Sequence, residues 1–379
     1  MSTVTVVGGG PAGLQCAICL RDAGVDVTVI EEHNEIGLPE ACSGLISVSG
    51  TTDLSLDVSS ILVNQIYGAR IVSPEGDEMI IERRRPVAHL ISRLGLDRML
   101  AAQAVAKGAE LRTGTQLMDI RKDSLFMKKN DHGEFKKTRF VVGADGPTST
   151  VRQLAKITPE SNRFIHGFQV TAEGNYNPRL VEVHLGSFAP GFFAWIIPEN
   201  EHVARVGLGA RLGSNITQLF DKFVLERRLE IRPVSKLSGL IPLGPPIEEP
   251  VAGNILLAGD AAFHTKATTG GGIMLGMKAA QLCAQSIIEH LNDKKPLKNY
   301  AQKLKPIHQD LKLHWKIYNV LQGLSPARQS ALFRKAKKAG LAEFLAEHGD
   351  MDKPSAYLGK ALAKPAFWGM APDLIRLLV

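Results

Sequence analysis

The chain has 379 residues, enough for two or three domains, and its 44% hydrophobic and 22% charged residues exclude an intrinsically disordered or collagen-like chain. Aromatic residues make up only 6%, which argues against a nucleic-acid surface built on stacked rings. The 45 Lys and Arg residues against 38 Asp and Glu residues give a net charge of +7, which permits an anionic partner such as a pyrophosphate or an acidic membrane surface.

The first predicted elements form a βαβ pattern. Residues 4–7 and 26–30 predict buried strands, and residues 11–23 between them predict a helix. Residues 51–90 alternate apolar and polar side chains, which predicts strands of another layer. Over residues 93–107 the apolar residues recur at helical spacing, which predicts a helix.

The middle of the chain is dominated by predicted strands. The charged run Lys128–Gly133 predicts the exposed tip of a hairpin, and residues 140–146 predict a buried strand that runs into a turn. Further strand-like stretches are Phe164–Val170, Val181–Leu185, Phe193–Ile197, Val203–Leu208 and Ile255–Asp260. A long helix is predicted from about Gly272 to Leu291. Residues 296–379 are mostly helical in pattern, with breaks predicted at Pro306, Pro326, Pro354, Pro365 and Pro372.

The beginning of the chain and its cysteines predict a cytoplasmic protein. A strand and a glycine-rich turn begin almost at once, so we expect no signal peptide. The sequence contains no run of about 18 uncharged apolar residues, so we expect no transmembrane helix. Four cysteines are too few for a disulfide framework. Cys16 and Cys19 form a CxxC inside the first predicted helix, so we interpret them as buried helix residues and predict no metal site.

The glycine-rich turn after the first strand predicts a dinucleotide site. Its sequence, Gly-Gly-Gly-Pro-Ala-Gly, fits the GxGxxG pattern. Gly8 permits the tight turn, Gly10 admits a pyrophosphate, and Gly13 allows the helix to pack closely on the strand. Glu31, at the end of the next strand, can accept hydrogen bonds from ribose hydroxyls. The alternative is a glycine-rich turn that binds no ligand.

Two later segments indicate which dinucleotide binds. Val142–Gly146, with Asp145, resembles the GADG segment of flavoprotein hydroxylases. Leu257–Ala262, with Asp260, resembles the GDAA segment in which an Asp contacts the flavin ribitol. Together with the first motif they resemble the three-part FAD signature of the group that includes p-hydroxybenzoate hydroxylase.

This resemblance implies an α/β fold with a Rossmann-like FAD-binding domain, an inserted antiparallel-sheet substrate or cap domain, and a C-terminal helical region. We expect the FAD-binding domain at residues 1–60, 91–158 and 245–295, the cap at 61–90 and 159–244, and the helical region at 296–379.

Two further features point toward the flavin. Thr268–Ile273 opens the long helix, where Gly271 and Gly272 let the backbone approach the isoalloxazine ring. The helix N–H groups would favour the anion that forms when flavin is reduced. The alternative is a structural loop of three glycines. We interpret Arg93, at the start of a predicted helix, as a flavin or phosphate contact, the alternative being a surface cation.

Three stretches resemble one family within that group, the geranylgeranyl reductases, and above all the archaeal enzymes that saturate digeranylgeranylglycerophospholipids. Pro39–Gly44 resembles the family's Pro-x-x-Cys-x-Gly segment, Pro190–Pro198 its Pro-x-x-Tyr-x-Trp-x-Phe-Pro motif, and Lys266–Ile273 its Lys-Pro-Thr-Thr-Gly-Gly-Gly-Ile segment. The resemblance covers roughly residues 1–290. Phe193, Ile197 and Ala267 replace the family's Tyr, Phe and Pro, which puts chain-length or head-group preference in question.

The resemblance also implies site residues. Flavin contacts are expected at Ala12, Glu31, Cys42, Gly44, Arg93, Asp260, Gly272 and Ile273, in addition to Gly8, Gly10, Gly13, Asp145 and Gly271 from the motifs above. Trp195 and Phe193 would act at the substrate as an apolar wall for a hydrocarbon, the alternative being two ordinary core residues.

Cys42 is a candidate catalytic residue at the flavin face. A thiol with a pKa of ~8.5 protonates an isolated alkene poorly, so we expect Cys42 to position the double bond or to relay a proton. The alternative is a small buried hydrophobic residue.

The sequence therefore predicts an FAD-dependent oxidoreductase that saturates C=C bonds of geranylgeranyl chains, with hydride from reduced flavin. Its electrons would come from an external donor, and ferredoxin, a deazaflavin and NAD(P)H all stay open. Basic clusters at Arg83–Arg85 and Arg334–Lys338 predict peripheral contact with a membrane surface, the alternative being solvated basic faces. The competing functions are an FAD-dependent aromatic-type monooxygenase, an electron-transfer flavoprotein–quinone oxidoreductase-like relay, and a non-enzymatic prenyl-binding escort.

Overall fold

The computed structural model describes residues 4–130, 132–161 and 163–370. Contacts within the chain divide it into two compact units, each assembled from three segments. Unit 1 contains residues up to 40, 93–163 and 242–311, and unit 2 contains residues 41–92, 164–241 and 312 onward. Residues 41–60 thus group with unit 2, and the C-terminal helices are divided between the units. The predicted domain boundaries stay a prediction.

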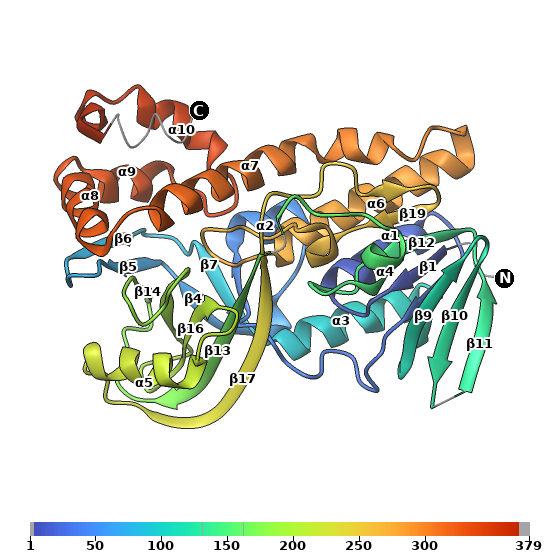
Figure 1. Cartoon of the computed structure of the whole chain (residues 1–379), viewed down its shortest axis with the longest axis horizontal. Coiled ribbons are helices and arrows are strands. Elements are labelled where there is room, and N and C mark those ends of the chain that lie inside the picture. Colours follow the sequence, from blue (N-terminus) through green and yellow to red (C-terminus); the bar gives the residue numbers. More distant parts are fainter. Residues whose placement is uncertain (1–3, 131, 162, 371–379) are drawn as a thin grey trace. The chain divides into compact units, whose positions relative to one another are not determined.

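Unit 1 is built around a six-stranded sheet whose central strands are parallel (Figure 1). In spatial order the strands are β18 (Val251–Ala252), β19 (Ile255–Leu257), β12 (Phe140–Gly143), β1 (Val4–Val7), β2 (Val27–Ile30) and β8 (Glu110–Arg112). Every residue of β1, β2 and β12 is buried, as expected of parallel strands covered on both faces. Because β1, β12 and β19 run in parallel, the glycine-containing turns that follow them meet at one edge of the sheet.

The helices of unit 1 include α1 (Pro11–Asp22) and α6 (Ile273–Asp293), which pack against each other. Pro11 is the first helical residue of α1, a position where its missing N–H costs nothing. Cys16 is fully buried, which confirms its predicted role as a helix core residue, and Cys19 is half-buried. The other helices are α3 (Arg93–Ala106), α4 (Thr150–Leu154) and the first half of α7 (Asn299–Gln322).

A separate three-stranded antiparallel sheet also belongs to unit 1 (Figure 1). Its strands are β9 (Thr115–Arg121), β10 (Ser124–Lys129) and β11 (His132–Lys137). Lys129 pairs with His132 at the hairpin end, where Lys128 and Lys129 are exposed. The predicted polar hairpin tip is therefore confirmed in its described residues.

Unit 2 is built around a seven-stranded sheet. In spatial order its strands are β17 (Arg232–Leu243), β13 (Arg163–Glu173), β16 (Val203–Arg211), β15 (Ala194–Pro198), β14 (Leu180–His184), β5 (Gly68–Val72) and β6 (Glu78–Glu82). The neighbouring pairs run antiparallel from β13 to β14 and between β5 and β6, whereas β14 and β5 run parallel.

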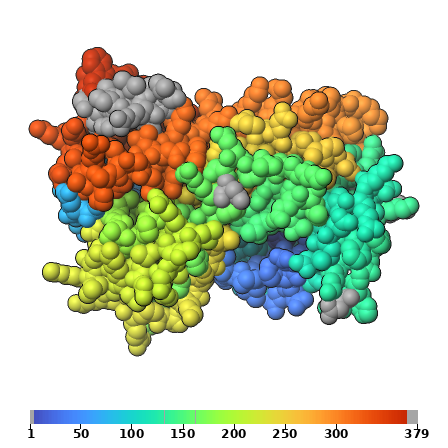
Figure 2. All heavy atoms as spheres, in the orientation of Figure 1, coloured from blue at the N-terminus to red at the C-terminus, as the bar shows by residue number. Residues whose placement is uncertain are grey.

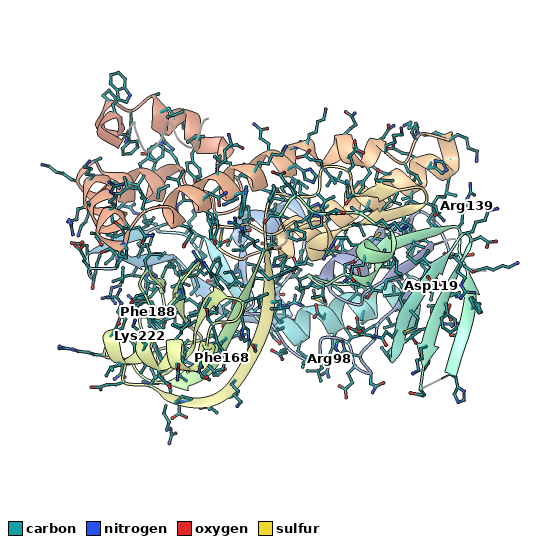
Figure 3. All side chains as sticks on the ribbon, in the orientation of Figure 1. Arg98, Asp119, Arg139, Phe168, Phe188 and Lys222 are labelled. Atoms are coloured by element: carbon teal, nitrogen blue, oxygen red, sulfur yellow. The ribbon has the colours of Figure 1, made fainter. Side chains whose placement is uncertain are left out.

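One face of this sheet forms the main core of unit 2 against helix α5 (Ile216–Glu226). Phe220 and Phe223 of α5 contact Phe168 and Phe188, which Figure 3 labels beside that helix. Ala194 and Ile196 of β15 point into this core, so the intervening Trp195 faces the opposite side of the sheet.

The remaining elements of unit 2 flank this sheet. A small antiparallel sheet contains β3 (Leu45–Ser47), β7 (Ala88–Ile91) and β4 (Leu62–Ile66). The helices and short 3₁₀ turns are α2 (Val48–Asp53), η1 (Ser59–Ile61), α8 (Pro326–Lys338), α9 (Leu341–His348), α10 (Ser355–Leu362) and η3 (Pro365–Met370). Met79 of β6 forms a second apolar cluster with Ala336, Phe344 and Phe367, which packs the C-terminal helices onto the sheet.

Two sequence predictions were wrong, and one helix was not predicted. The unpredicted helix is α5, which follows the last of the predicted strand-like stretches of this region, and its start is set by Asn215, whose side chain accepts from the Gln218 N–H. Residues 51–53 belong to α2, because Ser47 caps that helix through the Gly50 N–H. Pro306 does not break the chain but lies inside α7, where the buried Leu304 and other apolar residues hold both halves of the helix.

The other proline predictions fare better. Pro326 is the first helical residue of α8, Pro354 precedes α10, and Pro365 begins η3, so each marks an element boundary. Pro372 lies outside the described residues. None of the described helices combines the length and the apolar character needed to cross a bilayer.

Candidate functional site

The glycine turn between β1 and α1 has two glycines required by packing and one that faces open space. Gly8 has a φ of +106°, and a Cβ there would lie 2.3 Å from the Ala144 carbonyl oxygen. A Cβ on Gly13 would lie 2.0 Å from the Gly8 carbonyl oxygen. A Cβ on Gly10 would meet nothing within 4 Å among the described residues. Gly8 and Gly13 therefore fix the turn, while Gly10 leaves room beside the start of α1.

Glu31 lies beside this turn, at the end of β2. Its Oε2 accepts the Gly9 N–H at 2.8 Å, and its Oε1 accepts the His33 N–H at 3.0 Å. The His33 ring nitrogen Nδ1 is 2.6 Å from the same Oε1. The predicted ribose-binding carboxylate is thus next to the predicted pyrophosphate turn.

Arg93 and Asp97 form a buried ion pair at the start of α3. Arg93 Nη2 lies 2.8 Å from Asp97 Oδ2, and the side chains are 12% and 6% exposed. The Arg93 Nε and Nη1 atoms and Asp97 Oδ1 are buried without a hydrogen-bond partner among the described residues. Buried guanidinium nitrogens are normally paired, so this arrangement fits a further acceptor, such as a polar group of a cofactor.

Burial raises the pKa of Asp97 to about 6, although the positive charge of Arg93 opposes the shift. The negative charges of Glu31 and Glu40 add to the increase. The carboxyl groups of Glu31 and Asp97 therefore influence each other electrostatically, which brings the glycine turn and α3 into one site.

Asp260 occupies the turn η2 (Gly259–Ala262) that follows β19. Its Oδ1 accepts the Thr265 hydroxyl at 2.8 Å, and a Cβ on Gly272 would lie 3.0 Å from the same oxygen. Burial raises the pKa of Asp260, while the Arg93 charge opposes that shift. The segment from Asp260 to Gly272 thus folds back on itself near Arg93, and the predicted contact of Asp260 with the flavin stays a prediction.

Gly271, Gly272 and Ile273 lead directly into α6. Gly272 is the N-cap residue, and it offers no capping side chain to the first N–H groups of the helix. The N-terminus of α6 is therefore suited to an acceptor from outside the helix.

Asp145 has a local structural role that the motif did not reveal. Its carboxylate accepts the Ser149 hydroxyl at 2.6 Å and the Val151 N–H at 3.0 Å, which fixes the start of α4. Burial raises the pKa of this group, opposed first by the Ser149 hydrogen bond. Its predicted contact with the flavin stays a prediction.

The predicted substrate residues lie in unit 2, on the sheet face opposite the α5 core. Trp195 pairs in register with Gly207, and a Cβ on Gly207 would lie 2.7 Å from the indole. The indole Nε1–H donates to Gln169 Oε1 at 2.9 Å. Phe193 lies edge-on to Trp195, with ring centroids 6.0 Å apart. The two aromatic rings are thus neighbours, and the indole can lie close to the sheet backbone because Gly207 has no side chain.

Cys42 and Gly44 also belong to unit 2. Cys42 is half-buried, and the Gly44 N–H donates to its Sγ at 3.4 Å. Gly44 has a φ of +71°, which favours glycine at this position. The structure therefore groups Cys42, Gly44, Phe193 and Trp195 in one unit and the remaining predicted site residues in the other.

Several residues of these regions were missed in the sequence. The spacing of Arg93 and Asp97 by one helical turn could have identified that pair. Arg152, which accompanies the GADG segment, donates to the Ala261 carbonyl at 3.0 Å and to the Pro147 carbonyl at 2.8 Å, which ties two of the predicted FAD motifs together. One other residue had no local signal. His264 accepts the Gly259 N–H through Nδ1 and lies 3.4 Å from His308.

Protein-family models match two parts of the chain. A model described as an NAD(P)-binding Rossmann-like domain matches residues 6–39, and one described as an FAD binding domain matches residues 66–232.

The chain is also similar to named relatives. The digeranylgeranylglycerophospholipid reductase of Methanothrix thermoacetophila is 30% identical over 76% of this chain and 77% of its own. The digeranylgeranylglycerophospholipid reductase 1 of Methanothermobacter thermautotrophicus is 30% identical over 74% of this chain and 76% of its own. Among solved structures, a geranylgeranyl bacteriochlorophyll reductase-like protein from Thermoplasma acidophilum has a TM-score of 0.84 at 22% identity, covering 98% of both chains. That likeness confirms the predicted fold.

The cofactor is FAD, and unit 1 fits it. A polar dinucleotide could bind at three features of the described part of the chain: the space beside Gly10, the N-terminus of α6 without a capping side chain, and the Arg93 nitrogens that have no partner there. Together with the FAD binding domain match, these observations confirm the predicted cofactor. The chain belongs to the digeranylgeranylglycerophospholipid reductase family and is an FAD-dependent oxidoreductase.

Proposed function

We propose that this protein saturates C=C bonds of geranylgeranyl chains, with digeranylgeranylglycerophospholipids as the substrate class. The similarity to reductases named for that substrate supports the proposal. The observation that carries it is the Trp195 and Phe193 surface, where the indole lies over a glycine of the neighbouring strand and the Phe193 ring packs edge-on against it. Such a surface suits a flexible hydrocarbon chain, which offers no polar group to bind.

Each part of the chain has its own task in this proposal. When bound and reduced, FAD supplies the hydride. In unit 1, Gly10, Glu31 and Arg93 hold the cofactor, and the start of α6 offers N–H groups to its negative charge. In unit 2, the π faces of Trp195 and Phe193 stabilise positive charge that develops on the alkene. Cys42 positions the double bond or relays the proton.

Mass spectrometry tests the reaction. The purified protein is loaded with FAD, reduced with dithionite and incubated with digeranylgeranylglyceryl phosphate. We expect the lipid to gain one pair of hydrogens for each bond reduced. A lipid of unchanged mass, with flavin that stays reduced, would sink the proposal. Oxygen consumption with NADPH and an aromatic substrate would instead favour a monooxygenase.

The role of Cys42 is tested by Cys42→Ala and Cys42→Ser. We expect both variants to retain FAD and to lose much of their lipid reduction, with Cys42→Ser retaining more if a proton relay matters. Cys19→Ser is the matched control, because Cys19 is also half-buried but lies in α1. Unchanged lipid reduction by both Cys42 variants would eliminate a role for the thiol.

The electron donor is external in this proposal, and ferredoxin, a deazaflavin and NAD(P)H are the candidates. Anaerobic mixing of the oxidised protein with each reduced donor tests them. The physiological donor bleaches the flavin absorbance fast enough to support lipid reduction. If dithionite bleaches the flavin absorbance and none of the three donors does, all three candidates are contradicted.

We further propose that helix α8 contacts anionic head groups at a membrane surface. Arg328, Lys335, Lys337 and Lys338 are exposed on this helix, which lies at the surface in orange at the left of Figure 2. Arg334 instead pairs with Glu75 and Asp77. Arg83, from the other predicted basic cluster, donates to the carbonyls of Leu345 and Gly349, so it serves to hold α9.

Vesicle co-sedimentation tests this contact. We expect binding to anionic vesicles that weakens at high salt and is lost when Lys335, Lys337 and Lys338 are changed to Glu. Lys222→Glu is the control, because Lys222 is exposed on α5 and pairs with Glu226 (Figure 3). Binding that ignores lipid charge and salt would contradict the proposal.

A further inference from the structure

The segment Ala41–Gly44 lies against the same sheet that carries Trp195. A Cβ on Gly239 of β17 would lie 2.8 Å from the Ala41 carbonyl oxygen. A Cβ on the neighbouring Gly167 of β13 would lie 3.5 Å from the Gly239 carbonyl oxygen and 4.0 Å from Trp195 Cη2. The Cys42 segment is therefore a close neighbour of the aromatic surface within unit 2.

Arg205 of β16 holds this segment from the next strand along. Its Nη1 donates to the Ser43 carbonyl at 2.6 Å and to the Ile91 carbonyl at 3.2 Å. The Gly44 carbonyl in turn accepts the Ile91 N–H at 2.9 Å. One guanidinium thus joins the residue after Cys42 to β7, the strand that pairs with the chain following it.

Arg205 lies on the same face of the sheet as Trp195, the face against which the Ala41–Gly44 segment packs. Arg205 pairs in register with Ile197, and Gly207 pairs with Trp195, so Arg205 lies two residues from the glycine beneath the indole. Residues two apart in a strand point to the same face. Arg205 and the Trp195 ring therefore share one face of the sheet.

Glu199 sets the orientation of the guanidinium. Its Oε1 accepts from Arg205 Nε at 2.7 Å, which leaves Nη1 to serve the two carbonyls. The Arg205 and Glu199 side chains are 14% and 22% exposed. Charge-assisted bonds in such a shielded place are stronger than surface ion pairs, and the planar fork can serve all three oxygens at once.

We propose that Arg205 is a positioning residue that holds Cys42 in place beside the Trp195 surface. This inference rests on the proposed role of Cys42 in lipid reduction. Arg205 acts through the Ser43 carbonyl and does not itself need to touch the substrate. An ammonium group lacks the fork, so lysine at this position would hold the segment only in part.

The test measures how fast the Cys42 thiol of the FAD-loaded protein reacts with an aromatic disulfide reagent. A Cys19→Ser background leaves Cys16 and Cys283, both fully buried, as internal reporters. We expect Arg205→Met to raise the reaction rate of one thiol by about tenfold, because the lost hydrogen bonds let the segment open locally. Arg205→Lys should give an intermediate rate, and FAD content should not change.

Arg232→Met is the matched control, because Arg232 is an arginine of β17 in the same sheet that pairs with Glu173 and is 78% exposed. It should leave the thiol rate unchanged. An unchanged rate in Arg205→Met would overturn the proposal. So would simultaneous reaction of three thiols in both Arg205 variants, since that result means general unfolding.

Lipid reduction by the same variants separates this inference from the proposed function. If Arg205→Met accelerates the thiol reaction and Cys42→Ala reduces lipid normally, the positioning role stands and the role of Cys42 fails. If Cys42→Ala loses lipid reduction and Arg205→Met leaves the reaction rate of the Cys42 thiol unchanged, only the positioning role of Arg205 fails.

Discussion

Arg93 and Asp97 share a buried ion pair in which the carboxylate is only weakly favoured. Arg93 Nη2 is 2.8 Å from Asp97 Oδ2, yet burial raises the pKa of Asp97 from 3.8 to about 6. The folded chain therefore binds this proton more tightly than the unfolded chain does. The stabilisation that the proton provides is complete below about pH 4 and is lost as the pH rises through about 6.

The first prediction follows for Asp97→Asn, which mimics the protonated group at every pH. After removal of FAD, we expect the free energy of unfolding of the variant to exceed that of the parent by about 3 kcal/mol at pH 7.5. Below about pH 4 we expect the two free energies of unfolding to be equal. Denaturant titrations across this pH range measure the difference. A parent that is the more stable of the two at pH 7.5 would contradict the assignment.

Arg93→Met should weaken FAD binding without unfolding the chain. Arg93 offers two buried nitrogens that have no partner among the described residues, and a charged hydrogen bond to a ligand is worth about 2 kcal/mol, or roughly thirtyfold in affinity. Fluorescence titration of the FAD-free protein measures the affinity. Arg98→Met is the control, because Arg98 lies on the same helix, 57% exposed and paired with Glu35 (Figure 3). Equal affinities for both variants would refute a role for Arg93.

Gly10→Ala and Gly13→Ala should fail in different ways. A Cβ at Gly10 meets nothing within 4 Å among the described residues, so the variant should fold with nearly parental stability and lose FAD affinity by roughly tenfold or more. A Cβ at Gly13 would lie 2.0 Å from the Gly8 carbonyl, so that variant should fold poorly. Thermal unfolding and FAD titration separate the two effects. Tight FAD binding by Gly10→Ala would show that the cofactor does not approach this turn.

Trp195→Phe should be less stable by about 1 kcal/mol, because Gln169, which is 1% exposed, loses the indole N–H as a donor. Trp195→Ala should in addition lose lipid reduction while it retains FAD. Trp368→Ala is the control, because Trp368 is 63% exposed in η3. Loss of FAD from Trp195→Ala, with lipid reduction intact per bound flavin, would favour a purely structural role.

The sequence predicts the features whose cause is local. The βαβ start is visible because its strands are buried on both faces and its turn needs glycine at Gly8 and Gly13. Helix α5 has comparable signals, since Asn215 is a suitable N-cap and Ile216, Phe220 and Phe223 follow helical spacing. It was missed because strand-like stretches dominate this part of the sequence.

Contacts between distant residues could not be predicted in this way. Arg205 and Ser43 are 162 positions apart, and neither belongs to a pattern that names the other. His264 and His308 meet because α7 returns to the turn after β19. Such pairs are determined by how the elements pack, which a single sequence does not display.

The division of each unit among three segments has a consequence for how the chain is made. In unit 1, β1 pairs with β12, β12 pairs with β19, and Tyr300 donates to the Leu257 carbonyl. During synthesis β1 can pair early with β2, but its other edge waits for β12, which leaves the ribosome much later. Long waits expose apolar strands and slow the search for native contacts. We therefore expect refolding to be slow and truncated fragments to aggregate. If the chain is divided into two fragments, we expect them to assemble into folded protein only when both are synthesised together.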